Sequence, residues 1–283
     1  MGTMRSTSVS QPTMSPEFLD RYLEILGVSR REPSYEALSE IIQAHLYRIP
    51  FENISKLYYK QQRSLRGIPD LDTYLVGIER FHFGGTCYSN NFYLYRLLLT
   101  LGYEVKLCGA DMSSPDVHLL SIVTLGGREY LVDVGYAAPF WAPMPRDLKK
   151  DYSISLGSER YVLKPQDTGG RSRMELYRDG SLEHGYLAKP EARRIQEFEG
   201  PIADSFRDDS TFMTALLVAR FSPERSFVIR NMTLSEYEGT SVHSRELDSR
   251  EELIRSICSK FGMPQMILDD AVAELGTLRD TWS

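Results

Sequence analysis

Apolar side chains in the first hundred residues recur every three or four positions, the spacing of helices with one buried face. The pattern predicts four helices in this part of the chain, which begin near Ser15, Ser34, Asp70 and Cys87. Ser15 is a suitable N-cap, and Pro16 suits the first helical position. Gly102 marks the expected end of the fourth helix.

The period changes to that of strands after Gly102. Short segments rich in Val, Ile, Leu and Tyr follow one another, at 103–108, 117–125, 128–134, 160–164, 173–177 and 182–187. Asp179-Gly180 is typical of a hairpin turn between the last two. The final third mixes expected strands and helices, at 227–231, 234–237, 251–261 and 264–275.

The order of these elements predicts an α+β fold in three packed parts. We expect a disordered lead-in at 1–15, a helical domain at 16–102, a β-sheet or β-barrel domain at 103–199 and a mixed α/β domain at 200–283. The helical domain carries the first candidate site residue, and the β domain carries the others.

Composition narrows the class of protein. Of 283 residues, 42% are apolar and 25% are charged, and the net charge of −6 argues against a general nucleic-acid binder. Residues 1–14 lack the apolar stretch of a signal peptide, and no apolar run is long enough to span a bilayer. The three cysteines provide no disulfide framework. We therefore expect a cytoplasmic protein in which a reactive thiol survives.

The stretch Phe83-Gly84-Gly85-Thr86-Cys87 is the first candidate for chemistry. Two glycines permit a tight turn and the close approach of a ligand. A thiol at the start of a helix feels the positive end of the helix dipole, which favours the thiolate, and free N–H groups there can hold an oxyanion. The alternative is a buried, inert cysteine on a core helix.

His118 is the candidate base because a carboxylate is expected beside it. If Gly126-Gly127 is a symmetric two-residue hairpin turn, residues whose numbers sum to 253 face each other. Asp133 is then the diagonal neighbour of His118 on the same face, within reach of its ring. The alternatives are an odd-length loop, which puts the two on opposite faces, or a polar pair without function.

The other histidines are weaker candidates. His45 lies on the apolar face of the second helix and is expected to be a core histidine with its hydrogen bonds satisfied. His82 is interpreted as a loop residue, and His184 as a solvated residue of a hairpin. His243 has no acidic or thiol neighbour that the sequence identifies.

Residue types alone also allow a zinc site built from Cys87, Cys108, His118 and Asp133. Their spacings fit no compact zinc pattern, so we expect no metal. Dinucleotide-binding, P-loop and serine-hydrolase motifs are absent from the sequence.

With these residues in view, the chain resembles the arylamine N-acetyltransferases from about Phe18 onward. The family's first motif is present as Pro50-Phe51-Glu52-Asn53, and its nucleophile motif is matched at Gly84, Gly85, Cys87 and Asn91. Its histidine precedes apolar strand residues, as His118 does. Its aspartate stands in Val132-Asp133-Val134-Gly135, with the same fifteen-residue step from histidine to aspartate.

The resemblance implies a helical domain, a β-barrel domain and an α/β lid, with a triad arranged as in cysteine proteases. It implies acetyl transfer from acetyl-CoA to an aromatic amine or hydrazine, with acetyl-CoA as co-substrate and no metal. Cys87 would be acylated, His118 would be base and acid, and Asp133 would orient His118. Gly126 and Gly127 are candidates for letting CoA approach the barrel, although a role in the hairpin turn explains them equally well.

The chain departs from the family motif at Phe83, where the family has Arg, and at Ser89, where it has Glu or Gln. Glu52 is then expected to lack its usual arginine partner, with His82 as a substitute. Three alternatives remain open at this point: an amide synthase of the same superfamily, a non-catalytic binding homologue, and a thiol hydrolase that cleaves peptides.

Overall fold

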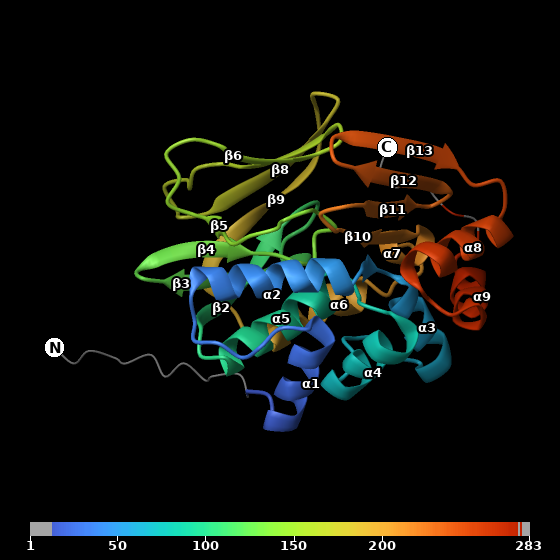
Figure 1. The fold of residues 1–283 in the computed structure, drawn as a ribbon, viewed down its shortest axis with the longest axis horizontal. Coiled ribbons are helices and arrows are strands. Elements are labelled where there is room, and N and C mark those ends of the chain that lie inside the picture. Colours follow the sequence, from blue (N-terminus) through green and yellow to red (C-terminus); the bar gives the residue numbers. More distant parts are fainter. Residues whose placement is uncertain (1–12, 277, 279–283) are drawn as a thin grey trace.

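The computed structural model describes residues 13–276 and 278. Helices and strands are largely segregated along the chain rather than alternating. In Figure 1, α1, α3 and α4 (blue to teal) lie at the bottom, the eight-stranded sheet (green to yellow) at the upper left, and the strands of the C-terminal third (orange to red) at the upper right. The fold is thus α+β, as the order of elements predicts.

Five helices precede the long strands: α1 (Pro16–Leu26), α2 (Tyr35–Arg48), α3 (Ile54–Arg63), α4 (Leu71–Phe81) and α5 (Cys87–Thr100). The four predicted helices are confirmed, and α3 is an addition. The Ser15 hydroxyl accepts from the Phe18 N–H, and Gly27 ends α1 in the left-handed conformation with φ of 63°. The Ser15 cap is the predicted one, and glycine is the residue most often found at such a helix end.

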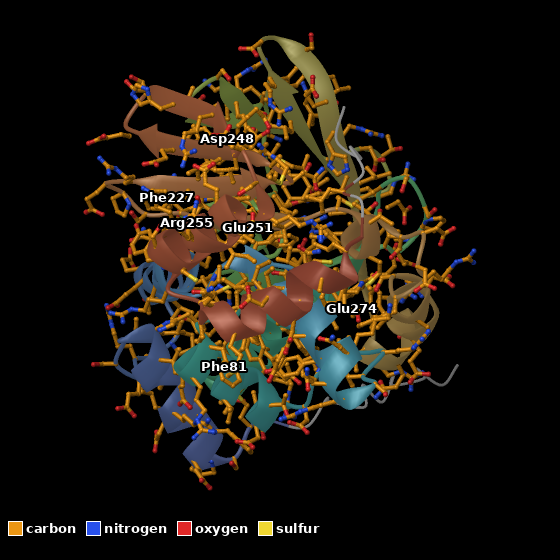
Figure 2. The ribbon with its side chains drawn as sticks, turned by 90° about the vertical axis from the view of Figure 1, so that its right-hand side faces the viewer. Phe81, Phe227, Asp248, Glu251, Arg255 and Glu274 are labelled. Atoms are coloured by element: carbon orange, nitrogen blue, oxygen red, sulfur yellow. The ribbon has the colours of Figure 1, made fainter. Side chains whose placement is uncertain are left out.

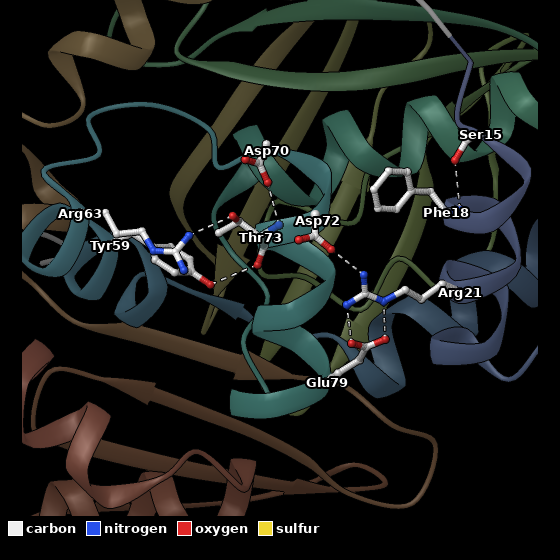
Figure 3. Close-up of polar contacts among 9 residues, drawn as sticks. All are labelled: Ser15, Phe18, Arg21, Tyr59, Arg63, Asp70, Asp72, Thr73 and Glu79. Atoms are coloured by element: carbon white, nitrogen blue, oxygen red, sulfur yellow. Dashed lines mark hydrogen bonds and ion pairs between the residues drawn. The ribbon is translucent and has the colours of Figure 1, made fainter.

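Charged side chains join α1 to α4 (Figure 3). The Arg21 guanidinium donates two hydrogen bonds to Glu79, at 2.7 and 2.6 Å, and one to Asp72, at 2.7 Å. The Asp70 carboxylate caps α4 by accepting from the Thr73 N–H at 2.7 Å. Exposed ion pairs each contribute at most about 1 kcal/mol, but this bidentate contact fixes how α4 lies on α1.

The middle of the chain forms one antiparallel, barrel-like sheet of eight strands in the order β5-β4-β3-β2-β9-β8-β7-β6. The strands are β2 (Glu104–Asp111), β3 (His118–Leu125), β4 (Arg128–Val132), β5 (Met144–Pro145), β6 (Tyr152–Leu156), β7 (Glu159–Leu163), β8 (Ser172–Arg178) and β9 (Ser181–Ala192). A separate apolar core fills it, including Leu120, Ile122 and Leu131. The sequence predicts six of these strands and misses the short β5 and β6.

The β3–β4 hairpin has the predicted register. Ser121 faces Val132 and Leu125 faces Arg128, so each pair of residue numbers sums to 253. Gly126 and Gly127 make the turn with φ of 57° and 77°, a conformation that L-residues with a Cβ adopt only under strain. The turn therefore determines which residues at the other end of the hairpin share a face.

The last third combines helices with a five-stranded antiparallel sheet in the order β1-β10-β11-β12-β13. Its elements are η1 (Ile195–Phe198), α6 (Glu199–Asp204), α7 (Thr211–Thr214), β10 (Leu217–Arg220), β11 (Ser226–Arg230), β12 (Thr233–Glu238), β13 (Ser241–Glu246), α8 (Arg250–Phe261) and α9 (Gln265–Glu274). In Figure 2, α8 and α9 lie between this sheet and Phe81 of α4. Of these elements, the sequence predicts β11, β12, α8 and α9.

The edge strand β1 (Phe51–Glu52) comes from the N-terminal third and pairs with β10. The Asn53 side chain strengthens this tie, because it donates to the Ala215 carbonyl at 2.9 Å and accepts from the Leu217 N–H at 2.9 Å. The first and last thirds of the chain are therefore held together, and the division into three domains stays a prediction.

Two further expectations, the disordered lead-in at 1–15 and the absence of a membrane-spanning segment, concern residues that the structure describes only in part. Residues 1–12 of the expected lead-in lie outside the described residues, whereas Met14 is buried and its N–H donates to Thr100 at 2.9 Å. In residues 13–276 and 278, no helix has the length and apolar character needed to cross a membrane.

Candidate active site

Cys87 is the first residue of α5 and is only 7% exposed. The N-cap residue Thr86 makes no side-chain cap hydrogen bond, so it leaves the N–H groups of the first turn without a side-chain acceptor from this cap. The Cys87 Sγ atom lies 4.0 Å from the Val117 carbonyl oxygen, directly before β3. The helix start thus brings the thiol to the beginning of that strand.

His118 and Asp133 meet where β3 begins and β4 ends. The His118 Nε2 atom is 2.8 Å from the Asp133 Oδ2 atom, and both residues are 2% exposed. This leaves Nδ1 for Cys87, which lies near enough to His118 to raise its pKa. The structure therefore brings the three predicted residues together.

Asn91 and Gly135 hold this junction together. The Asn91 amide donates to the Leu119 carbonyl at 2.7 Å and to Asp133 Oδ1 at 2.8 Å, while its oxygen accepts from the Val134 N–H at 2.8 Å. A Cβ atom on Gly135 would lie 2.6 Å from the Cys87 Cα atom. Only glycine at position 135 allows α5 to approach the end of β4 this closely.

Opposing influences set the charge of the pair. Burial lowers the pKa of His118. The charge and hydrogen bond of Asp133 and the nearby Cys87 raise it by more, so that the pKa is about 10. Burial raises the pKa of Asp133, and its partners His118 and Asn91 lower it below the ordinary value. An imidazolium beside a carboxylate is therefore the favoured state.

Aromatic rings surround His118. The Tyr186 and Tyr136 rings have their centroids 5.0 and 5.9 Å from the His118 ring. The Tyr136 hydroxyl lies 2.8 Å from Nδ1 of His184, which is exposed as expected but hydrogen-bonded as well. These rings come from segments far apart in the sequence, so no local pattern indicates them.

The remaining cysteines differ from Cys87. Cys108 lies inside the barrel core, where burial raises its pKa to about 12. Cys258 lies on α8 and is partly exposed. Among the residues that the structure describes, no group of three or more His, Cys, Asp or Glu side chains is arranged to hold a metal ion.

Gly126 and Gly127 do not join the site. They form the exposed turn at the opposite end of β3 from His118, about 25 Å along an eight-residue strand. Their positive φ angles explain both glycines as turn residues. A contact between this turn and CoA stays a prediction.

Glu52 has no arginine partner among the described residues, as expected, but His82 is not the substitute. Glu52 is fully buried and accepts hydrogen bonds from the Ser55 N–H at 2.7 Å and the Gly84 N–H at 3.0 Å. Phe83 instead packs in a cluster of aromatic rings with Tyr58, Tyr59 and Phe81. Backbone donors thus satisfy the carboxylate without an arginine.

His82 is a loop residue, as expected: it directly follows α4, adopts the left-handed conformation and lies against Gly262. His45 meets expectation only in part. His45 is fully buried, as expected, but neither ring nitrogen has a hydrogen-bond partner among the described residues. Burial alone lowers the pKa of His45 to about 3, so its ring is neutral.

A small cavity of about 30 Å³ lies beside the first turn of α5, with Thr86, Ser89 and Lys56 in its wall. Burial lowers the pKa of Lys56 to about 7, although the nearby Cys87 raises it. The ammonium donates to the Ser205 hydroxyl at 2.9 Å. Lys56 therefore joins α3 to the segment after α6 and brings a cation near Cys87.

The comparison with known proteins covers the part of the chain that contains these site residues. The N-acetyltransferase family model matches residues 34–266, which contain Cys87, His118 and Asp133. The chain belongs to the arylamine N-acetyltransferase family. The departures at Phe83 and Ser89 therefore occur within an arylamine N-acetyltransferase scaffold.

Curated relatives support this family membership. The pineal gland arylamine N-acetyltransferase NAT-3 of Gallus gallus is 36% identical over 146 residues, 48% of this chain and 49% of that protein. Arylamine N-acetyltransferase 1 of Oryctolagus cuniculus is 27% identical over 85% of this chain and 77% of its own length. Most of the leading curated relatives are matched over about half of their length.

The fold also matches the arylamine N-acetyltransferase of Mycobacterium marinum, solved in complex with CoA. The TM-score is 0.75 at 20% identity, over 91% of this chain and 99% of that one. The barrel-like sheet with its flanking helices is thus the arrangement of that structure.

Proposed function

We propose that this chain transfers an acetyl group from acetyl-CoA to an aromatic amine or hydrazine through an acetyl-Cys87 intermediate. The observation that carries this proposal is the His118–Asp133 pair, with 2.8 Å between Nε2 and Oδ2, at the point where the Cys87 Sγ atom meets the Val117 carbonyl beside His118. Family membership and the CoA bound to the M. marinum relative support the choice of donor.

In the first step the Cys87 thiolate, paired with the His118 imidazolium, attacks the thioester carbonyl of acetyl-CoA. Backbone N–H groups at the start of α5 would stabilise the oxyanion, an effect worth about 3 kcal/mol per donor in other enzymes. The bond to the CoA sulfur breaks, and CoA leaves with the proton from His118. Cys87 then carries the acetyl group.

In the second step the acceptor amine attacks the acetyl-Cys87 carbonyl. Neutral His118 accepts the proton of the amine, the C–S bond breaks, and the Cys87 thiolate and the imidazolium are restored. Asp133 holds the Nε2 proton of His118 in both steps, which keeps Nδ1 directed at the sulfur.

The test is to mix the protein with acetyl-CoA, omit the amine, and map the added acetyl group by mass spectrometry. We expect acetyl on Cys87, which an aromatic amine or hydrazine then removes. Cys108 and Cys258 are internal controls, since burial raises the pKa of both thiols. A folded, CoA-binding protein without label on Cys87 would contradict the mechanism.

The same experiment separates the alternatives. An amide synthase that uses carrier-bound acyl chains would not turn over free acetyl-CoA, and a non-catalytic homologue would leave Cys87 unlabelled. A peptide-cleaving thiol hydrolase would act on a peptide panel instead. Steady-state rates at several amine concentrations should give the parallel double-reciprocal lines of a two-step exchange.

A further inference from the structure

The Gly84-Gly85 turn, which leads into Cys87, packs directly on the segment around Pro50. A Cβ atom on Gly84 would lie 1.9 Å from the Pro50 carbonyl oxygen. The Glu52 N–H donates to the Gly85 carbonyl at 3.1 Å. The position of the turn, and with it the start of α5, is therefore set by this contact between two backbone segments.

Asn90 bridges the two segments from inside α5. Its side-chain nitrogen donates to the Pro50 carbonyl at 3.2 Å and to the Gly85 carbonyl at 3.1 Å. Its oxygen accepts from the Tyr74 hydroxyl of α4 at 3.0 Å. The two carbonyls require the nitrogen on their side, which leaves the oxygen for the hydroxyl and assigns the amide orientation. Asn90 is fully buried.

Tyr74 is itself held firmly. It is 2% exposed, and its ring stacks on Tyr93 of α5 with 4.6 Å between the centroids. Arg21 fixes α4 on α1 through Asp72 and Glu79. The Tyr74 hydroxyl is thus a rigid donor, and the Asn90 amide has one favoured orientation.

Asn90 and Asn91 are adjacent but serve different segments. Asn91 faces β3 and the end of β4, where it binds Asp133. Asn90 faces α4 and the Pro50 segment. Phe83, where the family has arginine, lies among aromatic rings. Asn90 therefore provides the polar contacts that join the Gly84-Gly85 turn to α4 and to the Pro50 segment.

We propose that Asn90 is a positioning residue for Cys87: it fixes the Gly84-Gly85 turn and thereby the direction of the thiol and of the N–H groups that begin α5. This inference rests on the proposed function. Without the amide, the Pro50 and Gly85 carbonyls lose a shared buried donor, and the turn relaxes. A misplacement of about 1 Å at a reacting group costs about 10²-fold in rate.

The experiment compares Asn90→Ala and Tyr74→Phe with Tyr103→Phe as the matched control. Tyr103 is also buried, and its hydroxyl donates to the Ser34 carbonyl at 3.4 Å beyond the far end of α5. Each variant is assayed below its unfolding temperature. The measurements are kcat/KM for acetyl-CoA across pH, the Kd for CoA, and the rate at which iodoacetamide alkylates Cys87.

We expect Asn90→Ala to lower kcat/KM about 10²-fold and to slow alkylation, with the Kd for CoA unchanged. Tyr74→Phe, which keeps the two carbonyl contacts, should lower both rates by a smaller factor, and Tyr103→Phe should change neither. If Asn90→Ala does not fold, Tyr74→Phe decides, because it removes a single oxygen. Wild-type rates in both variants would overturn the inference.

The alkylation rate keeps this test separate from the proposed function. If the wild-type protein transfers no acetyl group, the proposed function fails, yet slower alkylation in Asn90→Ala and Tyr74→Phe still supports positioning. If wild type transfers acetyl and the variants match it in both rates, only the role of Asn90 fails.

Discussion

His118 and His45 share a residue type and a degree of burial, with 2% and 0% exposure, but their surroundings act in opposite directions. Around His45 on α2, burial alone lowers the pKa to about 3. Around His118, the Asp133 carboxylate overcomes the same burial, and the pKa rises to about 10. Burial favours the neutral form of a histidine, whereas a neighbouring carboxylate that is itself held by hydrogen bonds favours the protonated form.

The two regions differ because of what faces the ring. Asp133 accepts from Asn91 and from the Gly135 N–H, at 2.8 and 2.9 Å, so it remains ionised although it is buried. The His45 ring has no ion pair or hydrogen bond among residues 13–276 and 278. The geometry at the end of β4 therefore makes one of two buried histidines suitable for proton transfer.

The largest expected effect comes from making His118 resemble His45. In Asp133→Asn the amide can accept from Asn91 as before, but the group that then faces Nε2 is able to donate. The proton of neutral His118 then belongs on Nδ1, where it blocks the thiol. We expect acetyl transfer to fall by about 10⁴-fold, the loss seen for this change in a serine triad.

Steady-state kinetics with acetyl-CoA and an aromatic amine measure this loss, and a thermal scan with CoA titration checks that the variant is folded. Near-normal turnover in a folded Asp133→Asn protein would remove Asp133 from the site. The difference between His118 and His45 would then have no consequence for catalysis.

The second prediction sharpens the contrast by direct titration. His118 should remain protonated up to about pH 10, whereas His45 should stay neutral down to about pH 3. Because the pKa of His118 is raised on folding, its stabilising contribution is complete below about pH 6.5 and is lost as pH rises to about 10. In Asp133→Asn, burial dominates, and the pKa should fall below the ordinary value.

NMR of the histidine ring protons measures both values, with His118→Gln and His45→Gln used for assignment. His184 reports on the charge of His118: although the residue is exposed overall, the protein packed around its ring lowers its pKa, and the charge of His118 lowers it too. Its titration should therefore change when His118 loses its charge. A His118 signal that titrates near pH 6.5 would contradict the electrostatic account.

The contact between His118 and Asp133 was predictable, because it depends on a local turn. Gly126 and Gly127 set the register, and the register places Asp133, six residues after the turn, diagonal to His118, eight residues before it. The approach of Cys87 was not, since α5 and β3 are separate elements and only the family motifs connect them. The Tyr74–Asn90 bond is equally non-local.

The elements that sequence reasoning missed lack the pattern on which it depends. Every residue of β13 is exposed, so no apolar face alternates along it. The helix α3 ends in the polar run Lys60–Arg63, and only its first half is mostly buried. The actual partners of Glu52 were missed because they are backbone N–H groups, which no side-chain pattern reveals.

The smallest effect is expected at His45 itself. In His45→Met a flexible apolar side chain replaces a ring whose two nitrogens have no partners among the described residues. Volume-conserving core changes cost less than about 1.5 kcal/mol, and removal of an unsatisfied buried group recovers about 1–3 kcal/mol. We expect acetyl transfer to be unchanged and the free energy of unfolding at pH 7 to change by about 1 kcal/mol or less.

The pH dependence makes this prediction specific. The pKa of His45 is lowered on folding, so from about pH 6.5 down to about 3 the unfolded chain binds a proton that the folded chain does not. Wild-type stability should therefore fall on acidification by up to about 1.4 kcal/mol per pH unit more than that of His45→Met. Urea unfolding of both proteins at pH 7, 6 and 5 measures the gap. If the free energies of unfolding of the two proteins fall equally from pH 7 to pH 5, His45 has a partner after all. The two buried histidines would then differ in degree rather than in kind.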